Sequence, residues 1–221
     1  MANLKLSRRE REKNQHKEEI LDSALRLFSE KGFYNVSMQE IAEESEFGVG
    51  TLYNFFESKE QLFIELMEAG IEKFGQTLIP ILDSNKKEQE KLSEFIEAHI
   101  ELIESNIKLI KLYVSQYGSV TMVNPVPQKQ SNDLSILIQK KLESIINAGI
   151  KKRIFRCVHA EIAALSLCAT LKAFMIESSG NFDKAKTKEG FSEIENLFMN
   201  SFLKIEYENN TPESEREKNA I

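Results

Sequence analysis

The sequence of 221 residues contains few of the residues that interrupt helices, with four prolines and nine glycines. Because both residue types disfavour helix interiors, their scarcity favours an all-α chain. Two cysteines are too few for a disulfide framework. The sequence also lacks the run of about 18 apolar residues that a membrane span needs, and its charged N-terminus lacks the apolar centre of a signal peptide. We therefore expect a cytoplasmic protein with no membrane partner.

The most informative segment runs from Ser37 to Lys59 and has the pattern of two short helices joined by a tight turn. Ser37 and Glu40 form an S-x-x-E capping box, which predicts the start of the first helix. Residues 46–48 interrupt the apolar periodicity, which then resumes in a second helix. A compact helix-turn-helix places its second helix in the major groove of DNA. The exposed side of that helix would carry Val49, Thr51, Tyr53 and Asn54.

The string I-A-E-E-S-E-F-G-V-G-T-L-Y-N-F-F-E-S-K-E-Q-L-F resembles the DNA-binding domain of the TetR/AcrR family of transcriptional regulators, over about Ile20 to Phe63. Its most specific part is Gly50-Thr51-Leu52-Tyr53, followed by Phe56, Ser58-Lys59-Glu60 and Leu62. The rest of the chain fits the family only in length and helical character. The resemblance implies an all-α fold with an N-terminal three-helix DNA-binding domain and a C-terminal helical domain that binds a ligand and dimerises.

The resemblance also implies roles for single residues. Ser37, Tyr53, Asn54 and Lys59 would contact phosphates, while Gly48, Val49 and Thr51 would face bases. Gly50 would let the helix backbone approach the duplex closely. For Leu52 and Phe56 the alternative interpretation, that they form the core of the small domain, is preferred. For Tyr53 the two interpretations remain open.

Three residues depart from the family pattern. Glu46 stands in the turn, where the family usually has glycine, and a positive φ there would cost about 1 kcal/mol. Phe55 occupies a place often held by histidine or tyrosine, and Val49 replaces a frequent lysine. These departures reduce the positive charge near the DNA, so the operator sequence cannot be copied from relatives.

The net charge of −6 is unusual for a DNA-binding protein, but the charge is unevenly distributed. The first seventeen residues carry six basic and two acidic side chains, about +4 by count. This arm could contact phosphates or a minor groove, or it could be a solvated, frayed terminus. Ser7 and Glu10 form a further capping box, so the arm could also be helical and continuous with the first helix.

We expect four parts along the chain: a basic arm (1–14), the helix-turn-helix domain (15–58), the ligand-binding and dimerisation domain (59–206) and a disordered tail (207–221). Helices are expected at about 15–31, from 59 to near Pro80, and at 91–104, 107–117, 133–148, 158–178 and 187–205. Alanines on the helix 158–178 and an apolar stripe on the helix 187–205 predict that these two helices make a homodimer.

The remaining residues offer little chemistry. The three histidines, His16, His99 and His159, lack the spacing of metal ligands, and no nucleophile has a recognisable partner. We therefore expect no metal, no cofactor and no enzymatic activity.

From the sequence together with the resemblance, which implies a ligand-responsive regulator, we expect a repressor that is released from double-stranded operator DNA by a small apolar or amphipathic effector. An alternative is a helical ligand-binding or protein-interaction module without specific DNA recognition. The candidate effector-binding residues lie on helices that the family uses around its pocket, although each could instead be ordinary core: Phe74, Phe95, His99, Tyr113, Tyr117 and Phe174.

Overall fold

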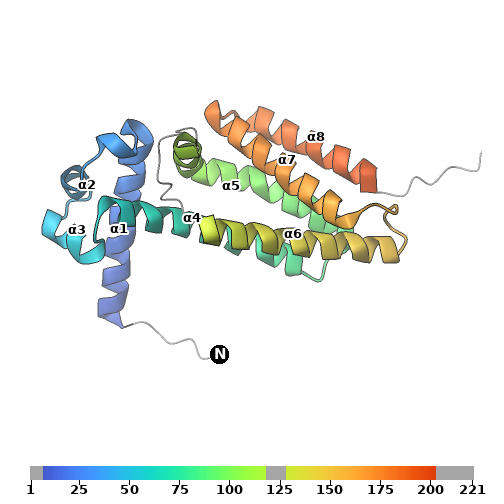
Figure 1. Ribbon diagram of the computed structural model, residues 1–221, viewed down its shortest axis with the longest axis horizontal. Coiled ribbons are helices and arrows are strands. Elements are labelled where there is room, and N and C mark those ends of the chain that lie inside the picture. The colour runs from blue at the N-terminus through green and yellow to red at the C-terminus, as the bar shows by residue number, and fades with distance from the viewer. Residues whose placement is uncertain (1–6, 118–127, 203–221) are drawn as a thin grey trace, which may run out of the picture.

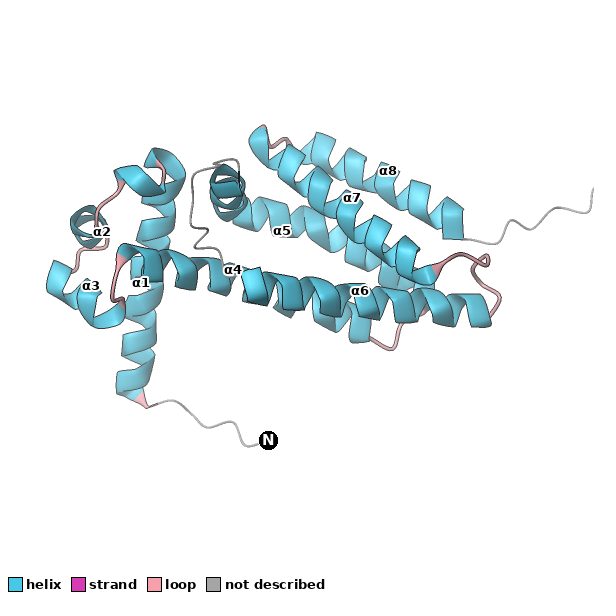
Figure 2. Cartoon of the chain, viewed as in Figure 1, coloured by secondary structure: helices cyan, strands magenta, loops and turns pink. Residues whose placement is uncertain are grey.

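The computed structural model describes residues 7–117 and 128–202, and this part of the chain forms helices and no strands. The helices are α1 (Arg8–Lys31), α2 (Met38–Glu44), α3 (Val49–Phe55), α4 (Lys59–Asp83), α5 (Glu88–Tyr117), α6 (Gln128–Lys151), α7 (Ala160–Gly180) and α8 (Lys184–Phe202), with a short 3-10 helix at Phe33–Asn35. Figure 1 shows α1, α2 and α3 as one group and α5 to α8 as another, with α4 running from the first group into the second. Figure 2 shows that short loops join most of the helices.

Local capping explains where the first helices begin. The Ser7 hydroxyl accepts a hydrogen bond from the Glu10 backbone N–H at 3.2 Å, and the Glu10 carboxylate accepts one from the Ser7 N–H at 2.8 Å. The same reciprocal pair joins Ser37 and Glu40 at the start of α2. At the start of α4 the Ser58 hydroxyl accepts from the Gln61 N–H. Each pair satisfies backbone donors that a helix start leaves without intrahelical partners.

The basic arm is helical from Arg8 onward, so the first helix begins earlier than residue 15. The rest of the arm and the predicted tail at 207–221 lie outside the described residues. Helix α4 continues past Pro80 to Asp83 although an interior proline removes one backbone hydrogen bond and crowds the preceding turn. The buried Leu78 and Leu82 on either side of Pro80 hold this end of α4 in the C-terminal core. The helices expected at 91–104 and 107–117 are two arms of α5, which bends at Asn106 (φ −128°, ψ 21°).

The helices enclose two hydrophobic cores. The N-terminal core joins α1, α2 and α3 to the first half of α4 and to Leu109 and Leu112 of α5. The C-terminal core joins the second half of α4 to the first arm of α5 and to α6, α7 and α8. The sequence predicted a domain boundary between residues 58 and 59. Side chains just after that boundary, such as Leu62 and Phe63 of α4, pack in the N-terminal core.

The turn between α2 and α3 contains a strained residue. Glu46 has φ of 60°, a left-handed conformation that places Cβ close to the backbone of an L-residue. The Glu46 N–H donates to the Glu43 carbonyl at 3.2 Å, and the Phe47 N–H donates to the Ala42 carbonyl at 3.0 Å. These bonds end α2 and turn the chain toward α3.

We predict that Glu46→Gly stabilises the protein by about 0.5 to 1 kcal/mol, because removing Cβ relieves the left-handed strain by more than glycine adds in unfolded-state entropy. Glu46→Ala, which keeps Cβ, is the matched control and should give no such gain. Urea unfolding of both variants measures the difference. Equal stability of the two variants would show that the turn is not strained.

Candidate functional site

The predicted reading surface is exposed on α3. Tyr53 is 55% exposed and Val49 is 36% exposed, and Gly48, Gly50 and Asn54 are also on the surface, with Thr51 half-buried beside them. Leu52 and Phe56 are buried in the N-terminal core, which confirms the core interpretation for these two residues. Helix α3 therefore presents one polar and glycine-rich face to solvent while its other face holds it to the domain.

Gly50 lies in α3 with open space around it. A Cβ built at this position would have no neighbour within 4 Å. No contact with residues 7–117 or 128–202 therefore requires glycine here, although alanine would be the better helix former. A close approach of another molecule to the α3 backbone is a physical reason for glycine at this position.

Lys59 is used within the protein. Its Nζ donates to the Phe33 carbonyl at 2.8 Å and to the Val36 carbonyl at 2.7 Å, and it lies 4.5 Å from the centre of the Phe33 ring. These bonds attach the start of α4 to the segment between α1 and α2. The contact of Lys59 with a DNA phosphate stays a prediction. These two hydrogen bonds use two of the three N–H donors of the ammonium, so the third could serve a phosphate.

Ser37 is likewise occupied, because its hydroxyl accepts from the Glu40 N–H at 3.2 Å. Glu40 in turn pairs with Lys31 at 2.8 Å. The hydrogen bond from Lys31, together with those from Ser37, lowers the pKa of the Glu40 carboxyl to about 2. A second pair joins Glu44 to Arg26 at 3.2 Å. Two carboxylates of the helix-turn-helix, Glu40 and Glu44, are thus compensated by cations of α1, which limits their repulsion of DNA phosphates.

The basic side chains at the start of α1 divide into two groups. Lys17 forms an ion pair with Glu65 and lies 5.7 Å from the Phe56 ring centre, so it secures α1 against α4. Lys13 lies 6.0 Å from the Phe55 ring centre, beside α3. Arg9 and Arg11 are exposed and have no ion pair among the described residues. Positive charge available to an anionic partner therefore stands next to the reading surface.

A cavity of about 470 Å³ lies in the C-terminal part of the fold, between α4, α5, α6 and α7. Four of the six predicted effector-binding residues line it: Phe74, Phe95, His99 and Tyr113. Phe174 is not among the lining residues, because its ring packs on Phe191 of α8 with the ring centres 4.9 Å apart. The side chain of Tyr117 lies outside the described part of the structure, so its role stays a prediction.

The structure adds lining residues that the sequence did not indicate. They come mainly from α6 and α7 and include Ser131, Asn132, Ser135, Ile138, Gln139, Leu165, Cys168, Lys172 and Met175. The polar members lie on α6, apart from Lys172 of α7, whose Nζ lies 5.8 Å from the centre of the Tyr113 ring. Helical periodicity could not have found them, because a cavity wall and a packed core have the same apolar spacing.

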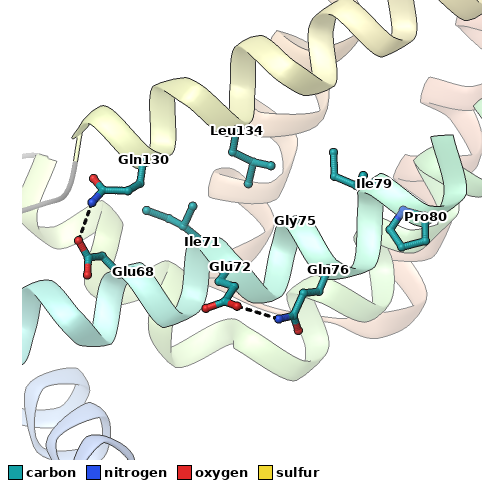
Figure 3. Close-up of a pocket in the computed structure, with 9 residues that line it drawn as sticks. All are labelled: Glu68, Ile71, Glu72, Gly75, Gln76, Ile79, Pro80, Gln130 and Leu134. Carbon is teal, nitrogen blue, oxygen red and sulfur yellow. Dashed lines mark hydrogen bonds between the residues drawn. The ribbon is translucent and has the colours of Figure 1, made fainter. Parts of the chain in front are cut away.

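A shallow groove adjoins the cavity on the outer side of α4 and α6. Figure 3 shows its lining, where Gln130 of α6 donates to Glu68 of α4 at 2.7 Å and Gln76 donates to Glu72 at 3.0 Å. Ile71 and Leu134 line both the groove and the cavity. The groove is open to solvent, so the more enclosed cavity is the better candidate for a small lipophilic molecule.

His99 is the buried polar residue of the cavity wall. It is 7% exposed, and its Nδ1 donates to the Phe95 carbonyl at 2.7 Å. Burial disfavours the charged imidazolium and lowers the pKa of His99 to about 4. The side chain is therefore neutral at physiological pH.

We predict that His99 makes stability fall as the pH drops from 6.5, its ordinary pKa, toward the folded-state pKa of about 4. Between these values the unfolded chain binds the additional proton, so acidification favours unfolding. The loss between roughly pH 7 and pH 5 should be about 2 kcal/mol. His99→Phe should remove this component in urea unfolding at both pH values, whereas His159→Phe, at an exposed histidine, should keep it. An equal loss of stability between pH 7 and pH 5 in the parent, His99→Phe and His159→Phe would show that other groups cause the loss.

Comparison with known proteins agrees with this arrangement. Residues 20–66 match the family model described as bacterial regulatory proteins, tetR family. The HTH-type transcriptional regulator YhgD of Bacillus subtilis is 27% identical over 134 residues, which cover 60% of this chain and 70% of YhgD. Another relative, the fatty acid metabolism regulator protein of Bacillus subtilis, is 22% identical over 136 residues, covering 61% and 70% of the two chains.

Two solved structures share the fold over most of both chains. The regulator FadR from Bacillus subtilis in complex with stearoyl-CoA superposes with a TM-score of 0.68 at 18% identity, covering 83% of this chain and 98% of FadR. The ketosteroid regulator KstR2 of Mycobacterium tuberculosis gives 0.66 at 19% identity, covering 85% and 95%. The family match covers the helix-turn-helix, whose α3 surface is exposed, so the DNA-binding domain of this chain is that of a tetR family transcriptional regulator.

Proposed function

We propose that the protein is a cytoplasmic, homodimeric repressor that leaves its operator when a lipophilic small molecule fills the cavity, and that it has no catalytic activity. The observation that carries this proposal is the position of α4. The helix begins at the helix-turn-helix, packs in its core and then forms a wall of the cavity. One rigid element therefore touches both the DNA-binding and the effector-binding parts.

Related proteins support the class of effector. The FadR structure holds stearoyl-CoA, and KstR2 is named as a ketosteroid regulator. A stearoyl chain and a ketosteroid each have a large apolar body. The cavity of this chain is mostly apolar, with polar residues on α6, at Lys172 and at the buried His99, and its volume is within the range of sites for drug-sized ligands. An apolar or amphipathic effector matches this lining.

The proposed coupling operates where the cavity meets the N-terminal core. Met67 of α4 and Leu109 of α5 belong to that core and also line the cavity. Between them stands Gly70, where an added Cβ would come within 2.2 Å of a Leu109 methyl group. An effector that pushes on these residues shifts α4 against α5 and favours a state whose reading heads fit DNA poorly.

Helix α7 supports the proposed homodimer. It is apolar over most of its length, and by length and composition alone it could cross a membrane, although it carries Glu161, Lys172 and Glu177. It packs against α5, α6 and α8, yet Ile162 is 54% exposed and Leu165 is 49% exposed. We propose that a second copy of the chain covers this face. A two-fold axis would then present two α3 helices about 34–36 Å apart, one turn of DNA.

The two helices expected to form the dimer differ in the structure. The apolar stripe of α8 packs inward, because Phe191 is buried and Ile194 and Phe198 lie against the C-terminal core. On α7, Ala160 and Ala164 are buried while Ala169 is exposed. The proposed contact therefore rests mainly on α7.

We predict that Ile162→Glu converts the dimer to a monomer in sedimentation experiments at micromolar concentration, because two carboxylates would be buried near the two-fold axis. Asn85→Glu adds the same charge at an exposed position before α5 and should leave the dimer intact. The monomer should lose its preference for a two-fold symmetric operator and keep weak, salt-sensitive binding to any DNA. A parent protein that sediments as a monomer would contradict the proposed dimer.

The parent protein should bind DNA from upstream of its own gene about 10³-fold or more tightly than unrelated DNA of equal length and salt. Gly50→Ala should lower the specific affinity by about tenfold, because its methyl group would stand between α3 and the duplex. The same change should stabilise the free protein by about 0.5 to 1 kcal/mol.

Gly180→Ala is the control for Gly50→Ala, because a Cβ at Gly180 also meets nothing within 4 Å and the residue lies at the end of α7. It should leave DNA binding unchanged. Equal parental affinity for upstream and unrelated DNA would favour the alternative of a helical module without specific recognition.

A further inference from the structure

One polar side chain of the cavity wall, His99, is buried among aromatic and aliphatic side chains. The His99 ring lies between Phe95 of α5 and Phe191 of α8, with ring centres 5.0 Å and 6.1 Å away. The same cavity wall holds apolar side chains of α4, α5 and α6, including Phe74, Leu78, Ile110 and Ile138. The polar lining on α6 and Lys172 lies on more exposed residues. His99 thus differs from the other polar lining residues in being buried.

The hydrogen bond of His99 Nδ1 determines whether the second ring nitrogen, Nε2, donates or accepts. The Phe95 carbonyl can only accept, so Nδ1 carries the hydrogen of their 2.7 Å bond. A neutral imidazole with its hydrogen on Nδ1 has an acceptor lone pair on Nε2. Burial keeps the ring neutral, since the pKa is lowered to about 4. Nε2 has no hydrogen-bond partner among residues 7–117 and 128–202.

A buried acceptor without a partner is destabilising, and a partner that satisfies it gains that free energy on binding. We infer that the cavity selects effectors that carry a hydroxyl group on their apolar body, and that this hydroxyl donates to His99 Nε2. The inference rests on the proposed function and specifies its effector more narrowly. A thioester, ketone or ether oxygen has no hydrogen to donate. An ammonium group could donate, but its charge would be buried among phenylalanine, leucine and isoleucine side chains.

Matched neutral probes test this selection on the full-length protein. Primary alcohols of about eight to twelve carbons suit a cavity of this size, and each is compared with the methyl ether that has the same number of heavy atoms. Alcohols are the more strongly hydrated of each pair, so a purely apolar cavity would prefer the ethers. We expect the parent protein to prefer the alcohols by about 2-fold to 12-fold in calorimetric or fluorescence titration, which is the ratio that one net hydrogen bond gives.

Two substitutions assign the preference to His99. His99→Phe keeps an aromatic ring between Phe95 and Phe191 but removes the acceptor, so its preference should reverse toward the ethers. His99→Gln retains an amide that can donate to the Phe95 carbonyl and an oxygen that can accept, so it should keep part of the preference for alcohols. His159→Phe, at an exposed position before α7, should behave as the parent does. Circular dichroism and thermal melting establish that each variant is folded.

Each outcome decides the matter. A parental preference for alcohols that is lost in His99→Phe and partly kept in His99→Gln supports the inference. Equal binding of alcohols and ethers by the parent, or a preference for alcohols that survives in His99→Phe, overturns the inferred hydrogen bond to His99. The cavity would then still be a site for apolar molecules. Binding of neither probe overturns the inference too and removes support for a lipophilic effector. Operator binding, measured separately, still tests the DNA-binding function.

Discussion

The architecture depends on α4 being one helix that belongs to two cores. Its first half contributes Leu62, Phe63 and Leu66 to the N-terminal core, and its second half contributes Leu78 and Leu82 to the C-terminal core. Burial of these side chains outweighs the interruption at Pro80, so the helix stays continuous. A continuous helix cannot move at one end without moving at the other. The relation between the two parts of the protein is therefore set by how α4 packs on α5.

The second constraint is the small size of the helix-turn-helix. Helices α2 and α3 have seven residues each, too few to be stable alone. Their stability comes from local caps, from buried side chains such as Ile41 and Leu52, and from Lys59, whose ammonium joins the α4 start to two carbonyls. Since these bonds connect α4 directly to the segment before α2, a displacement of α4 moves the reading head as a unit.

Features with a local physical cause could be predicted from the sequence. The capping boxes at Ser7 and Ser37 involve residues three apart, and the positive φ of Glu46 follows from the turn that the family pattern places there. The break in α5 was also located correctly, between Glu104 and Ile107. The bend forms because the buried Asn106 side chain donates to the Leu102 carbonyl at 2.8 Å, and the two arms remain joined in one kinked helix.

Features that depend on distant neighbours could not be predicted. Lys59 reaches carbonyls 26 and 23 residues earlier in the chain, and no sequence pattern distinguishes this role from a phosphate contact. Phe174 and Phe95 have the same apolar character, yet one packs on α8 and the other lines the cavity. Periodicity identifies the buried face of a helix, but the neighbour that this face meets is decided by the tertiary packing.

The lining of the cavity separates two tasks that an effector must perform. The two rings that His99 contacts, Phe95 and Phe191, belong to the C-terminal core, so in the proposed function a hydrogen bond to His99 would select the molecule without favouring either position of α4. Met67 and Leu109 also belong to the N-terminal core, so contacts with them differ between the two positions. Only contacts that differ between states shift an equilibrium, and a typical coupling of about 1 to 3 kcal/mol needs few of them. In the proposed function, selectivity at His99 and coupling at Met67 and Leu109 could therefore be changed independently.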